Sequence, residues 1–470
     1  MVPRSIGILL RKISGRASIG KAWFTTQQSH NSKFYDAIIV GGGMVGSTLA
    51  CAIGGDTIFQ NKKVLVLEAG PQVKLKELPE LYSNRVSTVS PGSKKLLERV
   101  GAWKHIENMR VKPFQRMQVW DACGDGYLTF EASDDLEQAI NMAYLVENNV
   151  LITALEMELE NLRSNVDVLY QTKMNTFRIP SPDTNDVDSP WAEITLEDGQ
   201  EFSTRLLVGA DGFNSQVRKN SGIDSISHDY RQSGVVATLC FSEPTKNIVA
   251  WQRFLPTGPI AILPLTDSKS SLVWSTTTSH AKNLVSLPEE RFVDAVNEAL
   301  TDDISKNSLS EMASNLLHNV LSMVQPDYLG LQIPPRIAGI EKNSRASFPL
   351  GVNHSSYYVK PRMALIGDAA HRIHPLAGQG VNLGFGDVEC LWNELRQAAI
   401  DGQDLGSLEH LLRYETARQK DVAVLMGVTH GLNTLFSTSF LPFVIARNLG
   451  IQMTNVMTPV KKQIMDYAMK

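Results

Sequence analysis

The chain has 470 residues, of which 43% are hydrophobic and 20% are charged, and its formal net charge is -4. A chain of this length usually exceeds what one hydrophobic core can organise, so we expect two closely associated domains. The charge balance argues against nucleic acid as a partner, because there is no basic excess to neutralise phosphates. The four cysteines lie far apart without a paired motif, which argues against a disulfide framework or a metal site and fits a reducing compartment.

Residues 1–33 differ from this average, because they carry basic residues and serines but no acidic residue. Wound as a helix, Ile6, Leu9, Leu10 and Ile13 would share one apolar face beside the basic side chains. This profile is typical of a mitochondrial transit peptide, and the alternative is a disordered basic tail. In either case we exclude the segment from the fold.

The chain after this segment begins with a strand at residues 35–40, a glycine turn, a helix to about Ile58 and a second strand at 64–68. This βαβ beginning predicts a mostly parallel sheet. A helix is then expected from Pro91 to about Val100. Alternation around a glycine turn at 124–126 predicts a hairpin of a second, antiparallel sheet.

Further along the chain, the pattern predicts a helix at 147–160, a polar loop at 181–186 and a helix from Glu289 to Leu300. Short strands are expected between them, at 235–241, 260–264 and 271–276. Residues 301–344 give no clear pattern. From Asp387 onward the chain is expected to be mostly helical. The longest uncharged stretch, residues 422–446, contains a proline and several polar residues, so we expect a buried or membrane-contacting helix pair and not a transmembrane span.

The first motif that carries chemistry is the glycine pattern Gly41, Gly43 and Gly46 between a strand and a helix. Such glycines permit a tight turn, close approach of a pyrophosphate and close helix packing, and the helix N-terminus presents N–H groups to the anion. Glu68 ends the next strand, where a carboxylate can accept hydrogen bonds from ribose hydroxyls. The pattern predicts a dinucleotide but does not separate FAD from NAD.

Two later motifs each place an aspartate beyond an apolar strand. The strand at 206–210 leads into the Asp211-Gly212 turn and a short helix, and the strand at 363–366 leads into Gly367 and Asp368. Ligands bind at the carboxyl ends of strands in such sheets. A glycine-rich turn with Gly378 then opens another helix.

These three motifs, in this order, resemble the aromatic-hydroxylase class of flavin monooxygenases. The resemblance implies an α/β fold like that of para-hydroxybenzoate hydroxylase. It combines a Rossmann-like FAD-binding domain, an interleaved antiparallel-sheet substrate domain and C-terminal helices. The expected ranges are 34–110, 145–225 and 345–400 for the FAD-binding domain, 111–144 and 226–344 for the substrate domain, and 401–470 for the C-terminal helices.

The same resemblance assigns roles around the cofactor. Asp368 would bind the ribityl chain, Arg85 would reach the flavin, and the Asp211 turn would lie near the cofactor and the path of the reductant. Backbone N–H groups of Gly378 and Gly380 would face the flavin N1/O2 edge.

The expected cofactor site also includes Asn382, in the helix that follows these glycines, and Pro375. Pro375 and Leu376 would form a water-excluding wall. No second nucleotide fold is evident, so NAD(P)H would dock transiently or an external ferredoxin-type redox protein would supply electrons.

A narrower resemblance lies in residues 84–90, 144–148, 251–265 and 374–384, which are similar to the ubiquinone-biosynthesis hydroxylase subfamily. With the basic N-terminus, it extends to the mitochondrial members. It implies hydroxylation at ring carbon C5 of a polyprenyl phenol, with O₂ reacting through a flavin C4a-hydroperoxide. It also implies a peripheral location on the matrix side of the inner membrane, in a complex with other enzymes of the pathway. Residues 301–344 are longer than in bacterial relatives.

The catalytic base is left open. His371, His374 and Tyr144 are eligible by type. Trp251 and Arg253 could face the substrate or pack at the edge of the sheet.

Two acids and one apolar stretch complete these expectations. Asp36 and Asp387 are expected to be ordinary turn or surface acids. The stretch around Phe436, Phe440 and Phe443 could be a docking face for a membrane or a partner, or part of the core.

Three rival functions remain open. One is another flavin-dependent phenol hydroxylase or hydroxylation at a different ring position. The second is a halogenase, which the absence of a Trp-x-Trp-x-Ile-Pro motif counts against. The third is a non-enzymatic prenyl-binding carrier, which would leave the Gly367-Asp368 motif unexplained.

Overall fold

The first sheet follows directly from the apolar strands of the sequence, and its central strands are buried on both faces, as is typical of parallel strands. Its order is β20-β21-β11-β1-β2-β8, and β21, β11, β1, β2 and β8 run parallel to their neighbours in this set. The strands are β20 Val359–Lys360, β21 Met363–Leu365, β11 Glu201–Gly209, β1 Lys33–Val40, β2 Val64–Leu67 and β8 Val166–Leu169. A hairpin extends the sheet beyond β11, formed by β9 Met174–Arg178 and β10 Ala192–Leu196.

The computed structural model describes residues 32–75, 77–124, 126–131, 141–180, 190–302, 332–374, 378–438 and 440–469. The expected transit peptide, apart from its last two residues, and the expected polar loop at 181–186 lie outside these ranges. So do Pro375, Leu376 and most of the segment at 301–344.

Helices pack on the parallel sheet and close the larger hydrophobic core. Helix α1 Met44–Gly55 lies against both α4 Asn148–Asn161 and α9 Gly380–Ile400. Their apolar faces and the buried strands form one continuous cluster. Smaller helices complete this region: η1 Thr57–Phe59, α2 Pro91–Arg99, α3 Trp103–Met109, α5 Gln216–Asn220 and η2 Gly367–Ala369.

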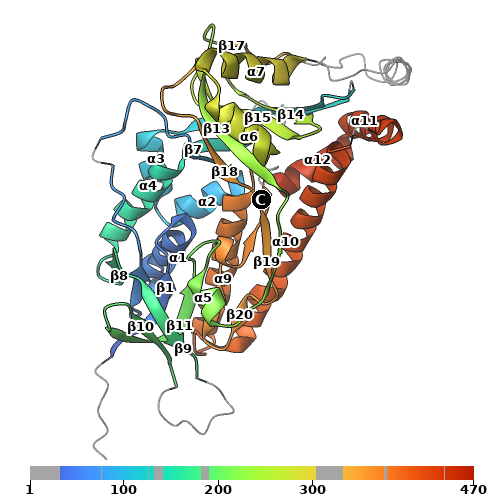
Figure 1. Cartoon of the computed structure of the whole chain (residues 1–470). Helices are drawn as coiled ribbons and strands as arrows, with labels where there is room; N and C mark the ends of the chain where they lie inside the picture. Colours follow the sequence, from blue (N-terminus) through green and yellow to red (C-terminus); the bar gives the residue numbers. More distant parts are fainter. Residues whose placement is uncertain are drawn as a thin grey trace, which may run out of the picture. The chain divides into compact units, whose positions relative to one another are not determined.

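The second large sheet has the order β17-β13-β16-β15-β14-β5-β6, and β18 also pairs with β13 (Figure 1). Its strands are β17 Ile337–Ile340, β13 Gln232–Phe241, β16 Lys269–Thr277, β15 Gly258–Pro264, β14 Val249–Leu255, β5 Arg116–Asp121, β6 Tyr127–Glu131 and β18 Ala346–Pro349. The expected hairpin is present as the antiparallel pair β5–β6. The sheet is antiparallel as predicted, except that β14 and β5 run parallel.

Two helices and a separate core belong to this second sheet. Helices α6 Thr278–Ser286 and α7 Glu289–Thr301 pack on it, and their apolar side chains join those of the strands in a second cluster. Two three-stranded sheets complete the strands, with the orders β3-β7-β4 and β12-β19-β22. They are formed by β3 Val86–Val89, β7 Ala143–Glu147 and β4 Lys112–Phe114, and by β12 Ser225–His228, β19 Val352–Ser355 and β22 His371–Arg372.

The C-terminal helices α10 Leu408–Phe436, α11 Leu441–Val456 and α12 Thr458–Ala468 contact both large sheets (Figure 1). Near the parallel sheet, the buried Tyr414 hydroxyl donates to the carbonyl of Leu365 at 2.7 Å. Helix α11 packs on β6 of the second sheet. The chain end returns to α2, where the N–H of Gly92 donates to the carbonyl of Met469 at 3.0 Å.

These elements confirm the predicted α/β class, with a Rossmann-like sheet, a second sheet and C-terminal helices. Residues Lys33–Lys470 form one compact unit, and the domain ranges given above remain predictions. Within the described ranges, none of the helices is both long and apolar enough to cross a membrane.

Candidate flavin site

Three turns that the sequence separates meet at one edge of the parallel sheet. Strands β1, β11 and β21 are neighbours and run in the same direction, so their carboxyl ends share an edge. The turn at Gly41 follows β1, the turn at Asp211 follows β11, and the turn at Gly367 follows β21. Backbone hydrogen bonds join them: the N–H of Ala210 donates to the carbonyl of Val40 at 2.8 Å, and the N–H of Ile366 to that of Gly209 at 2.9 Å.

The first turn is built by glycines with three different surroundings. Gly41 has φ +108°, and a side chain there would overlap the backbone of Ala210. A side chain at Gly46 would overlap the carbonyl of Gly41, so glycine lets α1 approach the turn. At Gly43, by contrast, no protein atom lies within 4 Å of where a Cβ would stand. The turn is therefore closed towards the sheet and open at Gly43, as an approaching pyrophosphate requires.

Glu68 lies directly after β2 and holds the neighbouring loop. Its two carboxylate oxygens accept hydrogen bonds from the N–H groups of Gly42 at 2.7 Å and Gly70 at 2.6 Å. Each carboxylate oxygen can accept more than one hydrogen bond, so ribose hydroxyls can still bind to it.

Asp211 caps the short helix α5. Its Oδ2 accepts from the N–H groups of Gln216 at 2.6 Å and Val217 at 3.2 Å. The sequence motif also contains Arg218, to which no role was assigned. Its buried guanidinium donates to the carbonyls of Phe213 and Ala369, both at 2.7 Å. Arg218 thus ties the Asp211 turn to the Gly367-Asp368 turn.

Asp368 is exposed, yet the surrounding protein raises the pKa of its carboxyl group by desolvation. Beside it, the side chain of Val45 from the start of α1 lies 3.3 Å from where a Cβ of Gly367 would stand. The first and third motifs are therefore in contact.

The expectation that Asp387 and Asp36 are ordinary surface acids is wrong. Asp387 is 0% exposed and accepts hydrogen bonds from the N–H of Gly367 at 2.8 Å and from His371 Nε2 at 2.7 Å. Asp36 is 8% exposed and accepts from Arg205 Nε at 2.9 Å. The signal for Asp387 was its position: it lies on the same buried face of α9 as other core residues.

The opening of α9 supplies the other expected cofactor contacts. Gly378 and Gly380 are exposed, and at Gly380 no protein atom lies within 4 Å of a Cβ position. The amide of Asn382 is used within the protein: its Oδ1 accepts from Ser90 N at 3.0 Å, and its Nδ2 donates to Thr88 O at 2.8 Å. Asn382 thus joins α9 to the end of β3.

Arg85 lies directly before β3 and is exposed. The loop that carries it is fixed by two buried glutamates of other segments. Glu147 accepts from the N–H of Ser83 at 2.6 Å, and Glu341 accepts from the N–H of Tyr82 at 3.2 Å. The loop is therefore anchored while the Arg85 guanidinium reaches solvent.

The three candidate bases have different surroundings. His371 is buried and bound to Asp387. Tyr144 packs edge-on against Trp103, with ring centroids 5.2 Å apart. His374 is 0% exposed; its Nε2 lies 3.1 Å from Gln232 Oε1, and its Nδ1 has no hydrogen-bond partner among the described residues. Burial lowers the pKa of His374 to about 4, so its imidazole is neutral near pH 7.

Trp251 and Arg253 both lie in β14, which is an interior strand between β15 and β5. They are 6% and 1% exposed, and Arg253 NH1 donates to the carbonyl of Ala299 in α7 at 3.3 Å. Both residues therefore pack inside the second sheet and not at its edge.

The residues at the shared edge fit FAD. The helix N-terminus behind an open Gly43 suits a pyrophosphate, Glu68 suits a ribose, and the accessible Asp368 suits a polyhydroxylated ribityl chain. At the start of α9, the exposed Gly378 and the unobstructed Gly380 suit a flavin ring bound by backbone N–H groups.

Comparisons with known proteins agree with this site. A family of FAD binding domains matches residues 35–320 and 335–427. The structure is also similar to a probable FAD-dependent monooxygenase, PqsL of Pseudomonas aeruginosa, with TM-score 0.65, 20% identity and coverage of 90% of this chain and 100% of the other. For the p-nitrophenol 4-monooxygenase PnpA of Pseudomonas putida the TM-score is 0.64, with 17% identity and coverage of 93% and 98%. The fold and the site therefore define an FAD-binding protein with the fold of these monooxygenases.

Whole-length relatives define the family more narrowly. The mitochondrial ubiquinone biosynthesis monooxygenase COQ6 of Xenopus tropicalis is 51% identical, over 99% of this chain and 98% of the relative. The human protein of the same name is 50% identical, over 96% of this chain and 95% of the relative. The chain belongs to the family of mitochondrial ubiquinone biosynthesis monooxygenases.

Proposed function

We propose that the protein hydroxylates ring carbon C5 of a polyprenyl-substituted, 4-hydroxybenzoate-derived phenol in ubiquinone biosynthesis. The supporting observation is the convergence of three flavin-site turns at one sheet edge, in a chain that matches named ubiquinone biosynthesis monooxygenases along its whole length. Bound FAD supplies the activation of O₂ that the protein's own side chains cannot provide. One oxygen atom enters a ring C–H bond as C–OH, and the other leaves as water with two electrons and two protons.

The protein's part in this reaction is to bind and orient the cofactor and substrate. The N-terminus of α1 and Glu68 hold the dinucleotide end, and Asp368 holds the ribityl chain. The N–H groups at Gly378 and Gly380 stabilise negative charge on the flavin ring. Arg85, on an anchored loop but exposed, reaches towards the flavin.

Among the three candidate bases, His374 is favoured for handling a proton. Its Nδ1 has no hydrogen-bond partner among the described residues, so this atom can accept a hydrogen bond from a substrate hydroxyl. His371 is hydrogen-bonded to the buried Asp387, and Tyr144 packs against Trp103. The electrons come from outside the chain, from NAD(P)H directly or from a ferredoxin-type redox protein.

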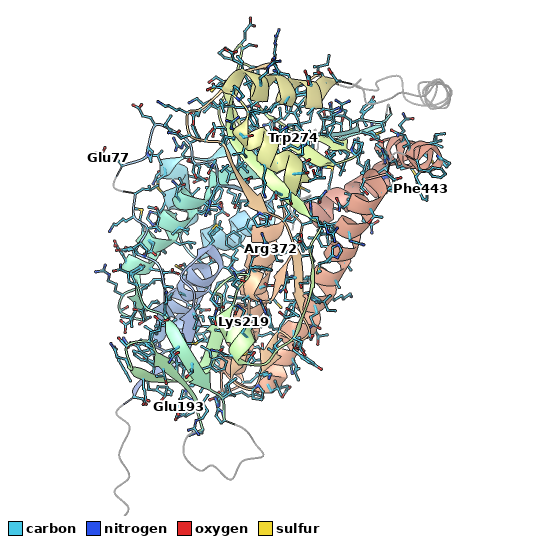
Figure 2. All side chains as sticks on the ribbon, viewed as in Figure 1. Glu77, Glu193, Lys219, Trp274, Arg372 and Phe443 are labelled. Carbon is cyan, nitrogen blue, oxygen red and sulfur yellow. The ribbon has the colours of Figure 1, made fainter. Side chains whose placement is uncertain are left out.

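We also propose a peripheral location on the matrix side of the mitochondrial inner membrane, with other enzymes of the pathway. Phe440 and Phe443, near the junction of α10 and α11, are 62% and 54% exposed, and residues 422–446 carry no formally charged side chain. Figure 2 shows Phe443 at the outer surface of these helices. Further large apolar side chains are exposed along α11 and α12 and at the residue between them: Met453, Met457, Val460 and Ile464. Such a surface suits contact with lipid, where a prenylated substrate resides.

The test is mass analysis of the prenylated phenols in a cell line whose own gene for this protein is deleted. We expect a precursor that lacks the C5 hydroxyl to accumulate, and its conversion to ubiquinone when the gene is restored. Normal ubiquinone in the deletion line would overturn the assignment. Accumulation of a precursor that lacks a different hydroxyl would support the alternative, a flavin-dependent phenol hydroxylase that acts at another ring position.

A further inference from the structure

One buried carboxylate contacts three residues in two other segments around the flavin site, residues 367–371 and helix α10. Asp387 lies in α9 and is 0% exposed. Its Oδ2 accepts from the N–H of Gly367 at 2.8 Å and from His371 Nε2 at 2.7 Å. Its Oδ1 accepts from Nε of Arg418, in the C-terminal helix α10, at 2.7 Å.

These contacts join the two parts of the site that face the flavin half of the cofactor. Gly367 has φ +60° and begins the turn that carries Asp368. The helix that holds Asp387 begins at Gly380, where the open N–H groups are. A single side chain therefore fixes the turn relative to the helix N-terminus.

Arg418 is more than a counter-ion for Asp387. Its NH2 donates to the carbonyl of Leu383 at 3.1 Å, in the first turns of α9, and its NH1 donates to Asp421 at 2.9 Å. Glycine at position 386 makes room for it, since a Cβ there would stand 2.9 Å from Arg418 NH2. The guanidinium is thus packed against α9 as closely as the backbone permits.

The charge state of the cluster agrees with its geometry. Burial alone would raise the pKa of Asp387, but the neighbouring His371 and Arg418 outweigh it, and the pKa is lowered. The carboxylate therefore stays ionised, and its hydrogen bond to the N–H of Gly367 is charge-assisted.

We propose that Asp387, oriented by Arg418 and His371, is a positioning residue that sets the Gly367-Asp368 turn and the N-terminus of α9 for FAD. The C-terminal helix α10 is thereby part of the cofactor site. This inference depends on the FAD cofactor and is independent of the substrate and ring position proposed above.

The experiment compares Asp387→Leu and Asp387→Asn with Asp121→Leu. Asp121 is a matched control, because it is 2% exposed and paired with a buried arginine, Arg447, in the second sheet and α11. We expect both leucine variants to lower the melting temperature of the apoprotein. Only Asp387→Leu should weaken FAD binding, by about tenfold or more, because it removes the charged acceptor of Gly367.

The first readout is FAD affinity, measured by quenching of flavin fluorescence at a temperature at which both leucine variants are folded. The second is the midpoint potential of the bound flavin. Asp387→Asn keeps an oxygen acceptor in the same shape, so its affinity should fall between wild type and Asp387→Leu. Equal FAD affinity in Asp387→Leu and Asp121→Leu would show a merely structural role and overturn the proposal. If Asp387→Leu does not fold, Asp387→Asn decides: an affinity and potential equal to wild type overturn it, and a loss of affinity without loss of fold supports it.

Discussion

Arg447 in α11 forms a bidentate ion pair with Asp121 at the end of β5, with Nε to Oδ2 at 2.6 Å and NH2 to Oδ1 at 3.0 Å. Both side chains are about 1% exposed. The same guanidinium donates to the carbonyls of Leu435 at 2.8 Å and Thr438 at 2.6 Å, so it also caps the C-terminal end of α10. This pair fixes the turn between the C-terminal helices to the second sheet.

Replacing Arg447 by methionine should strongly destabilise the protein. The change leaves the carboxylate of Asp121 buried without its cation, and breaking a buried pair from one side costs about 3–5 kcal/mol. The free energy of unfolding from urea denaturation measures this. Arg413→Met provides the control, because the pair of Arg413 with Glu409 is exposed and should contribute less than about 1 kcal/mol. Equal losses in the two variants would contradict the prediction.

Two alanine substitutions in the first turn should separate cofactor binding from folding. Gly43→Ala places its methyl group where no protein atom lies within 4 Å, so the melting temperature of the apoprotein should stay close to wild type. Its FAD affinity should fall about tenfold or more, because the methyl group fills the approach of the pyrophosphate. Gly46→Ala should lower both quantities, since its methyl group overlaps the carbonyl of Gly41. Unchanged FAD affinity in Gly43→Ala would place the pyrophosphate elsewhere.

The buried His374 predicts a specific pH dependence of stability. Its pKa is about 4 in the folded protein, against about 6.5 in an unfolded chain, so the unfolded state binds more protons between these values. The stability that the neutral His374 contributes is complete above about pH 6.5 and is lost as the pH falls towards 4. Between pH 7 and pH 5 the loss should be about 2 kcal/mol.

His374→Gln should remove this part of the pH dependence. The measurement is urea denaturation of the apoprotein at both pH values, with His228→Gln as the control because His228 is exposed in β12. Equal pH dependence in wild type and His374→Gln would show that the imidazole is not kept neutral.

The apolar tip formed by Phe440 and Phe443 should carry membrane binding. The double change Phe440→Glu with Phe443→Glu should weaken binding to vesicles of phosphatidylcholine and cardiolipin by about tenfold or more, because it replaces apolar side chains that would enter the lipid by charges. Co-sedimentation measures the bound fraction. The control is Ile226→Glu with Ile400→Glu, which adds the same charges at positions on β12 and α9 that are at least as exposed. If the tip variant co-sediments with vesicles as strongly as wild type, this surface does not bind lipid, and a protein partner becomes the alternative.

Much of the fold could be predicted because its signals are local. Apolar runs and glycine turns placed β1, α1 and β2 almost at their observed bounds, and Pro91 and Glu289 marked helix starts that the structure has. Helical periodicity could indicate that Asp387 lies on the buried face of α9, but not which groups it contacts. The contacts of Asp387 are with a partner 31 residues further along the chain, Arg418, and with a glycine turn 20 residues before it. Trp251 and Arg253 were uncertain for the same reason, since their strand is interior only because β5 pairs with it.

The sequence by itself indicated an FAD-binding protein, because its glycine spacing meets the local requirement of a pyrophosphate and its three motifs, in this order, resemble those of flavin monooxygenases. It also determined the family, through residues spread over the whole chain. Only the tertiary structure decided which polar side chains remain for the cofactor and which hold the site together. That division depends on hydrogen bonds between distant segments. Asn382 is hydrogen-bonded to Thr88 in β3, and His371 and Arg418 are hydrogen-bonded to Asp387, whereas Asp368 stays accessible.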